Sequence, residues 1–145
     1  MATEPEIRVR KLLEDGLGVQ FQCDRRCVDD WGQADGWAML TNETWLVVEV
    51  EAKQKHPTTN VLKYWPYLEN HRNERIVLAH CFFPDSPGLS SSRGKLARWL
   101  GSRLELLLEG RFFYQPIVVP TLGEPVEGFD DLERRVLTER RKETV

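Results

Sequence analysis

The chain has 145 residues, a length typical of a single domain that buries its own hydrophobic core. Hydrophobic residues make up 41%, charged residues 30%, and the net charge is −3. This composition excludes a disordered chain and a strongly basic nucleic-acid binder. No apolar run approaches the ~20 residues that cross a bilayer. The N-terminus also lacks the pattern of a signal peptide, so we expect a cytoplasmic protein.

The first part of the chain predicts one helix followed by three strands. Residues 3–15 carry an apolar stripe at helical spacing, with glycines immediately after it, and are expected to form the helix. A charged segment with turn character, 25–32, interrupts the strands. The expected strands, which are rich in β-branched and aromatic residues, are 19–24, 37–40 and 45–52.

The middle of the chain predicts a helix, a strand and a loop. A helix capped by a threonine is expected over 58–68, with Pro66 causing a kink or a late start. Residues 75–82 form a near-continuous apolar run, which is typical of a strand covered on both faces. A loop rich in proline, glycine and serine is expected over 83–94.

The strongest helical periodicity lies at residues 95–109. Its large apolar side chains are expected to face the core, and they are Leu96, Trp99, Leu100, Leu104 and Leu107. A last strand is expected over 112–119, followed by a linker over 123–128. A charged helix is expected over 130–142, where a narrow apolar stripe predicts packing on a partner subunit.

The resulting order is α-β-β-β-α-β-α-β, which predicts an α/β domain with a mixed sheet between helices. We expect one domain over residues 1–122 and a charged C-terminal helix or tail over 123–145.

A chemical site is predicted where the central strand turns acidic. Residues two apart in a strand share a face, so Glu49, Glu51 and Lys53 line one side, while the other side is apolar. Asp35 lies on the preceding strand of the same hairpin. Carboxylates grouped in this way can hold a divalent cation, and an amine beside them can supply positive charge.

This arrangement resembles the PD-(D/E)xK nuclease superfamily, which has the restriction-endonuclease-like fold. In that family an Asp opens one hairpin strand, and the next strand ends in Glu-x-Lys after an apolar run. The resemblance covers roughly residues 3–83 and implies a Mg²⁺- or Mn²⁺-dependent nuclease acting on DNA. It implies that Asp35, Glu49 and Glu51 bind the metal and that Lys53 orients water or stabilises the transition state. The chain departs from the family pattern because Ala34, not proline, precedes Asp35.

Two alignments of the motif remain open. One places Glu49-Val50-Glu51 at the motif, with glutamate where the family has lysine. The other places Glu51-Ala52-Lys53 there and supplies the lysine directly. Both glutamates lie an even number of residues from Asp35, so hairpin geometry does not choose between them. Lys63, on the following helix, is a second candidate for the lysine.

Other residues have weaker matches. Glu6 resembles an acidic residue that the family adds from its first helix, and Thr3-x-x-Glu6 is also the pattern of a capping box. Asn60 and Tyr64 are four residues apart on the helix after the motif, where family members contact substrate or shape the site.

The resemblance also implies partners and an alternative function. A homodimer is expected because one small site that cuts two strands usually needs two copies. The alternative is a catalytically inactive nuclease-fold module that mediates protein or nucleic-acid binding. A zinc site is a third possibility, although three dispersed cysteines favour reduced thiols. Its ligands would be Cys23, Cys27, His80 and Cys81.

Overall fold

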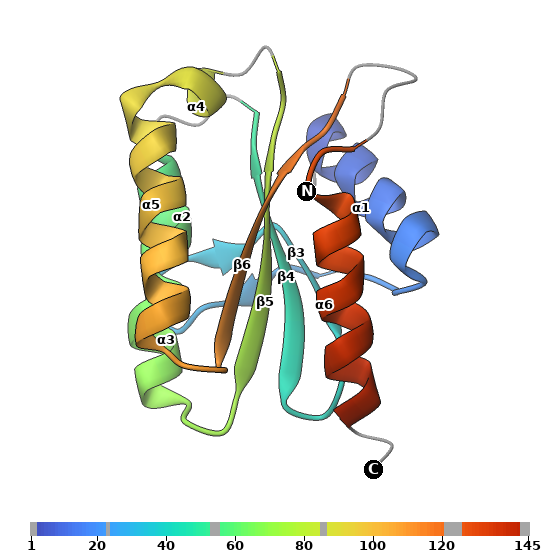
Figure 1. The fold of residues 1–145 in the computed structure, drawn as a ribbon, viewed down its shortest axis with the longest axis vertical. Coiled ribbons are helices and arrows are strands. Elements are labelled where there is room, and N and C mark those ends of the chain that lie inside the picture. Colours follow the sequence, from blue (N-terminus) through green and yellow to red (C-terminus); the bar gives the residue numbers. More distant parts are fainter. Residues whose placement is uncertain (1–2, 23, 53–55, 85–86, 121–125, 143–145) are drawn as a thin grey trace.

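The computed structural model describes residues 3–22, 24–52, 56–84, 87–120 and 126–142 (Figure 1). Its helices are α1 (Glu4–Leu17), α2 (Pro57–Leu62), α3 (Tyr64–Asn70), α4 (Pro87–Ser90), α5 (Ser92–Leu107) and α6 (Phe129–Arg141). Its strands are β1 (Arg26–Cys27), β2 (Gln33–Ala34), β3 (Gly36–Met39), β4 (Thr44–Glu51), β5 (Arg75–Phe82) and β6 (Phe112–Val118). Within these described ranges, no helix is long and apolar enough to cross a membrane.

The main sheet has four strands in the order β3-β4-β5-β6. Strand β3 pairs antiparallel with β4, whereas β4, β5 and β6 run parallel to one another. Parallel neighbours require crossover connections, and these are supplied by α2 with α3 and by α4 with α5. The predicted α/β domain with a mixed sheet flanked by helices is confirmed. Strands β1 and β2 form a separate two-stranded hairpin.

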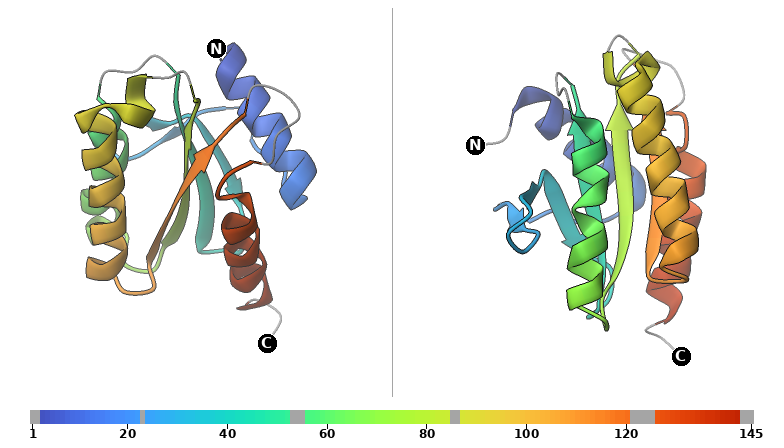
Figure 2. Two further views of the ribbon diagram at one scale, coloured as in Figure 1. Left: turned by 45° about the horizontal axis from the view of Figure 1, so that its top comes forward. Right: turned by 90° about the vertical axis from the view of Figure 1, so that its left-hand side faces the viewer.

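Helices cover both faces of the sheet (Figures 1 and 2). One hydrophobic cluster lies under α1 and α6 and includes Val48 and Val50 of β4. The other lies under α2, α3 and α5 and includes Val47 of the same strand. Successive side chains of β4 point to opposite faces of the sheet, so the strand contributes residues to both hydrophobic clusters.

The strand expected over 19–24 is not assigned among the described residues, which omit Cys23. The predicted alternation is nevertheless real, because Val19 and Phe21 are buried in the cluster under α1 and α6. One backbone hydrogen bond, from Gln22 N to Trp37 O at 3.0 Å, joins this segment to the edge of the sheet. The segment expected as a turn over 25–32 contains β1.

The helix expected over 58–68 is two helices that meet at Lys63. It begins at Pro57, with His56 as its N-cap, so the expected threonine cap is wrong. Pro66 explains the break because it has no N–H to donate back to the carbonyl of Leu62. The loop expected over 83–94 contains α4, and α5 begins early because the Ser91 side chain caps it.

The buried face of α5 differs from the predicted one. Its core-facing residues are mostly small, and they are Gly94, Ala97, Gly101 and Leu104. Of the predicted stripe only Leu104 is buried, and Leu100 is partly buried. Leu96, Trp99 and Leu107 are more than half exposed, at 54%, 58% and 58%. The small residues bring the helix close to β6, where Tyr114 fills the space beneath Gly101.

Helix α6 does not project as a tail. Leu132 and Val136 belong to the same core cluster as the sheet and α1. Its last turn is held by Arg140, which donates to the carbonyls of Leu17 and Gly18. Two members of the apolar stripe that predicted a contact with a partner subunit are therefore buried within this chain, whereas the third, Leu137, is 42% exposed.

Replacing Gly101 with alanine tests the close approach of α5. A Cβ there would lie 2.4 Å from ring atoms of Tyr114, so the helix or the ring must move. We expect Gly101→Ala to lower the free energy of unfolding by about 1–3 kcal/mol, despite alanine's better helix propensity. Urea denaturation measures this, with Ser102→Ala on the exposed side as the control. Equal stability of the two variants would contradict the packing described.

Candidate functional site

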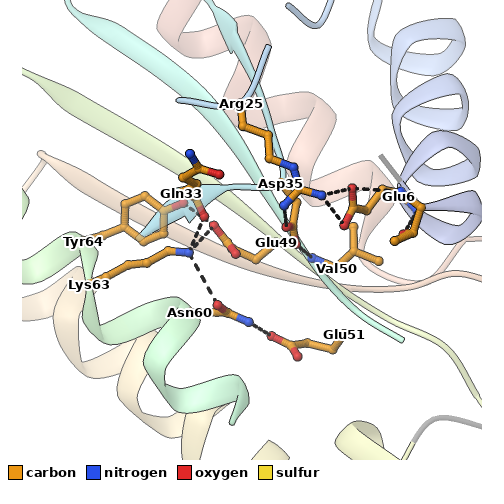
Figure 3. A network of polar contacts seen from close by, with 11 residues as sticks. Glu6, Arg25, Gln33, Asp35, Glu49, Val50, Glu51, Asn60, Lys63 and Tyr64 are labelled. Carbon is orange, nitrogen blue, oxygen red and sulfur yellow. Dashed lines mark hydrogen bonds and ion pairs between the residues drawn. The ribbon is translucent and has the colours of Figure 1, made fainter. Parts of the chain in front are cut away.

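Asp35 lies between β2 and β3, beside the end of the central strand β4. The β3–β4 pairing ends with Gly36 against Val48, and the Asp35 N–H donates to the same Val48 carbonyl at 3.1 Å, so Asp35 is an extra residue outside the regular pairing. The Asp35 carboxylate in turn accepts a 2.8 Å hydrogen bond from the N–H of Val50 (Figure 3). Beyond the effect of burial, Asp35 is close enough to Glu49 for its negative charge to raise the pKa of that carboxyl.

Glu49 is buried between two residues from the junction of α2 and α3. The Lys63 ammonium lies 3.0 Å from Glu49 Oε2, and the Tyr64 hydroxyl donates to the same oxygen. Lys63 also donates to the Gln33 carbonyl at 2.8 Å, which ties the β1–β2 hairpin to this point (Figure 3). The structure therefore brings Lys63 to the acidic residues. Lys53 lies outside the described residues.

Glu51 occupies a second polar position on the same face of β4. Its Oε1 accepts hydrogen bonds from Asn60 Nδ2 at 2.6 Å and from His80 Nε2 at 2.9 Å. The other ring nitrogen of His80 accepts from the Tyr114 hydroxyl at 2.7 Å. A carboxylate only accepts, so the Nε2–H tautomer of His80 fits both partners. Asn60, expected near the substrate, here positions Glu51.

Glu6 joins the site through an arginine. The Arg25 guanidinium donates to both carboxylate oxygens of Glu6, at 2.8 and 3.0 Å, and lies 3.5 Å from Asp35. Glu6 also forms the predicted capping box with Thr3. The capping box is therefore confirmed, and Arg25 is the cation that links Glu6 to Asp35 (Figure 3).

Burial dominates the electrostatics of these groups. Burial raises the pKa of Glu49 to about 8, even though the Lys63 ammonium opposes the shift. Burial also raises the pKa of Asp35, against the hydrogen bond from Val50. For His80, burial lowers the pKa, which keeps the ring neutral in spite of the Glu51 carboxylate. The cluster thus holds more acidic groups than its two cations offset.

The donor chemistry of the cluster fits a hard divalent cation. Asp35, Glu49 and Glu51 offer carboxylate oxygens, which are the ligands Mg²⁺ takes from proteins. The raised pKa values of Asp35 and Glu49 show that added positive charge would favour their ionised forms. In the described part of the chain, however, no three His, Cys, Asp or Glu side chains are gathered closely enough to hold a metal ion. The carboxylates face internal donors instead.

Three residues of the cluster were not anticipated in these roles: Arg25 and His80 contact the acidic groups, and Tyr114 contacts His80. His80 was considered only as a zinc ligand, whereas one of its ring nitrogens bonds Glu51 and the other bonds Tyr114. The available signal was that His80 is a polar residue within the apolar run of β5. It pairs with Glu49 on the neighbouring strand, and directly opposed residues share a face of the sheet. The zinc alternative finds no support here: Cys27 is exposed, Cys81 is buried, and Cys23 is not described.

The sequence and the structure were compared with known proteins. No protein-family model, curated protein or solved structure matches this chain.

The raised pKa of Glu49 predicts a specific pH dependence of stability. Between about pH 4.5 and 8 the folded protein retains a proton on Glu49 that the unfolded chain has released. Stability from this group is therefore complete at low pH and lost as pH rises through about 8. Glu49→Gln removes this titration. We therefore expect the free energy of unfolding of the variant, relative to that of the wild type, to rise by up to about 1.4 kcal/mol for each pH unit of increase in this range.

Urea denaturation of both proteins across this pH range measures the difference. His80 and Asp35 titrate in both proteins and cancel to first order in the comparison. A constant difference at all pH values would mean that Glu49 is ionised throughout, contrary to the pKa described.

Proposed function

We propose that this chain is a metal-dependent nuclease of the PD-(D/E)xK type, with the restriction-endonuclease-like fold, that hydrolyses phosphodiester bonds in DNA. One observation carries the proposal: Asp35 and Glu49 lie close enough for the charge of Asp35 to add to burial in raising the pKa of Glu49, and the Lys63 ammonium lies 3.0 Å from Glu49. Two carboxylates on adjacent strands with an amine beside them are the groups that this chemistry requires.

The arrangement of elements supports the fold assignment within this proposal. An N-terminal helix precedes a hairpin whose first strand follows Asp35 and whose second strand ends in Glu49-Val50-Glu51. A helical crossover then leads to a parallel strand, β5. Under this alignment Glu51 takes the place of the family's lysine, and Lys63 supplies the positive charge from the crossover.

Each residue would have a distinct role. Asp35, Glu49 and Glu51 would hold Mg²⁺ or Mn²⁺, which when bound lowers the pKa of a coordinated water and offsets charge on the phosphate. Lys63 stabilises the negative charge that develops at the phosphoryl group, since its ammonium is held in place by Gln33 and Glu49. Arg25, whose side chain is 34% exposed, attracts the DNA backbone toward Asp35.

A second candidate is a nuclease-fold module that binds without cutting. One observation favours it: the carboxylates already have internal donors. Arg25 and the N–H of Val50 contact Asp35, and Tyr64 and Lys63 contact Glu49. A protein that never binds a cation would keep these contacts permanently.

Cleavage assays test the leading proposal. Purified protein is incubated with single-stranded, double-stranded and branched DNA in Mg²⁺ or Mn²⁺, with chelator as a control. We expect cleavage that Asp35→Asn and Lys63→Met each reduce by about 10²-fold or more, since each removes charge from the reacting centre. Glu43→Gln, an exposed carboxylate on the β3–β4 turn, is the matched control and should cut normally. Cleavage unaffected by Asp35→Asn would place the chemistry elsewhere.

Metal binding separates the two candidates independently of any DNA substrate. We expect Mn²⁺ to bind the wild type by calorimetry and to stabilise it by about 2.7 kcal/mol at a hundredfold excess over its Kd. Asp35→Asn should lose both effects, while Glu43→Gln retains them. A wild type that neither binds Mn²⁺ nor cuts any of the three DNAs would establish the binding module in place of the nuclease.

A further inference from the structure

An apolar stripe runs along the outer surface of α5. Leu96, Trp99 and Leu106 are 54%, 58% and 68% exposed, and Arg103 completes the row between Trp99 and Leu106. Steps of three and four residues place all four on one face of the helix, in the a and d positions of a heptad. Leu107 flanks the row and is also exposed.

This face points away from the domain. The opposite side of α5 packs on the sheet through small residues, and Gly101 contacts Tyr114. Figure 2 (right) looks onto α2, α3 and α5 with the sheet behind them, and no other described element lies over α5. The helix therefore has two apolar faces, of which this chain buries one.

The stripe is complementary to itself in the antiparallel direction. Leu96 and Leu106 lie equally far from Gly101 along the helix, and so do Trp99 and Arg103. A two-fold axis at the level of Gly101 would set each leucine against the other leucine and each tryptophan against an arginine. Trp99 and Arg103 already form a cation–π contact within one chain, where the Arg103 guanidinium lies 5.7 Å from the centroid of the Trp99 ring.

The charged residues near the two ends of the stripe are of opposite sign. Lys95 and Glu109 are both exposed; Lys95 lies near the start of α5, and Glu109 lies in the turn that follows its last residue, Leu107. In an antiparallel pair, the start of one helix lies beside the end of the other. Lys95 of one copy then approaches Glu109 of the other, and the contact occurs twice.

We propose that α5 forms an antiparallel, two-fold symmetric pair with α5 of a second copy of this chain. Its centre is the Trp99–Arg103 contact, and its ends are the Lys95–Glu109 ion pairs. The apolar side chains expose on the order of 450 Å², about half of the ~800 Å² that each partner buries in a standard interface. Polar groups around the stripe supply the remainder, as interface rims do. This inference does not depend on nuclease activity.

The first test measures mass in solution. We expect the wild type to sediment as a dimer at micromolar concentration and Leu96→Glu/Leu106→Glu to sediment as a monomer with an unchanged circular dichroism spectrum. Ile7→Glu, at an equally exposed apolar position on α1, is the control and should remain dimeric. A monomeric wild type, or a dimer that survives the double substitution, would overturn the proposal. Binding of the wild type to anionic vesicles as a monomer would assign the face to a membrane instead.

Charge exchange tests the register without touching the apolar groups. Lys95→Glu and Glu109→Lys should each weaken the dimer about 10-fold, because each places like charges together at both ends. The double variant Lys95→Glu/Glu109→Lys should recover wild-type affinity. An equimolar mixture of the two single variants should form a heterodimer, since opposite charges then meet at both ends. No recovery in the double variant or the mixture would overturn the antiparallel pairing.

Discussion

The register between β3 and β4 is the constraint on which the site and both cores depend. Asp35 accepts a hydrogen bond from the N–H of Val50, one residue before the end of β4. A slip of one residue would turn every side chain of β4 to the opposite face. Glu49 would then enter the aliphatic cluster under α1 and α6, where no cation lies among its described members, and Val48 would face Lys63. Such a slip would bury the Glu49 carboxyl group without its hydrogen-bond partners, so the acid cluster itself helps to select the correct pairing.

Each buried acid is held by a group from a different part of the chain. Arg25 comes from the segment before β1, Lys63 from the junction of two short helices, and His80 from the adjacent strand. The helix break at Lys63 thus has a structural use, since it brings Lys63 and Tyr64 to the same carboxylate oxygen. Removing one partner leaves a buried charge whose cost is several kcal/mol, so the fold and the cluster are interdependent.

The sequence predicted the fold class and the residues of the acidic strand, but not their partners. Alternation along β4 was enough to group Glu49 with Glu51, because that pattern is local. The placement of Asp35 was open, because it lies just outside the regular β3–β4 pairing, at an irregularity that the sequence does not show. For α5 the predicted core-facing side was wrong, because the prediction assumed that the largest apolar side chains are the buried ones. The close approach of Tyr114 selects Gly101 and Ala97 instead, and this requirement is visible only in three dimensions.

The division of the sheet into two covered faces has a consequence for the order of folding. The cluster under α2, α3 and α5 takes its last member from β6, at Tyr114. The cluster on the opposite face needs Leu132 and Val136 of α6 as well as α1. During synthesis one core can therefore close while the other still exposes the aliphatic face of β4 and β5, waiting for the final helix to emerge. A ribosome-bound chain stalled before α6 would be the form most exposed to chaperones and aggregation.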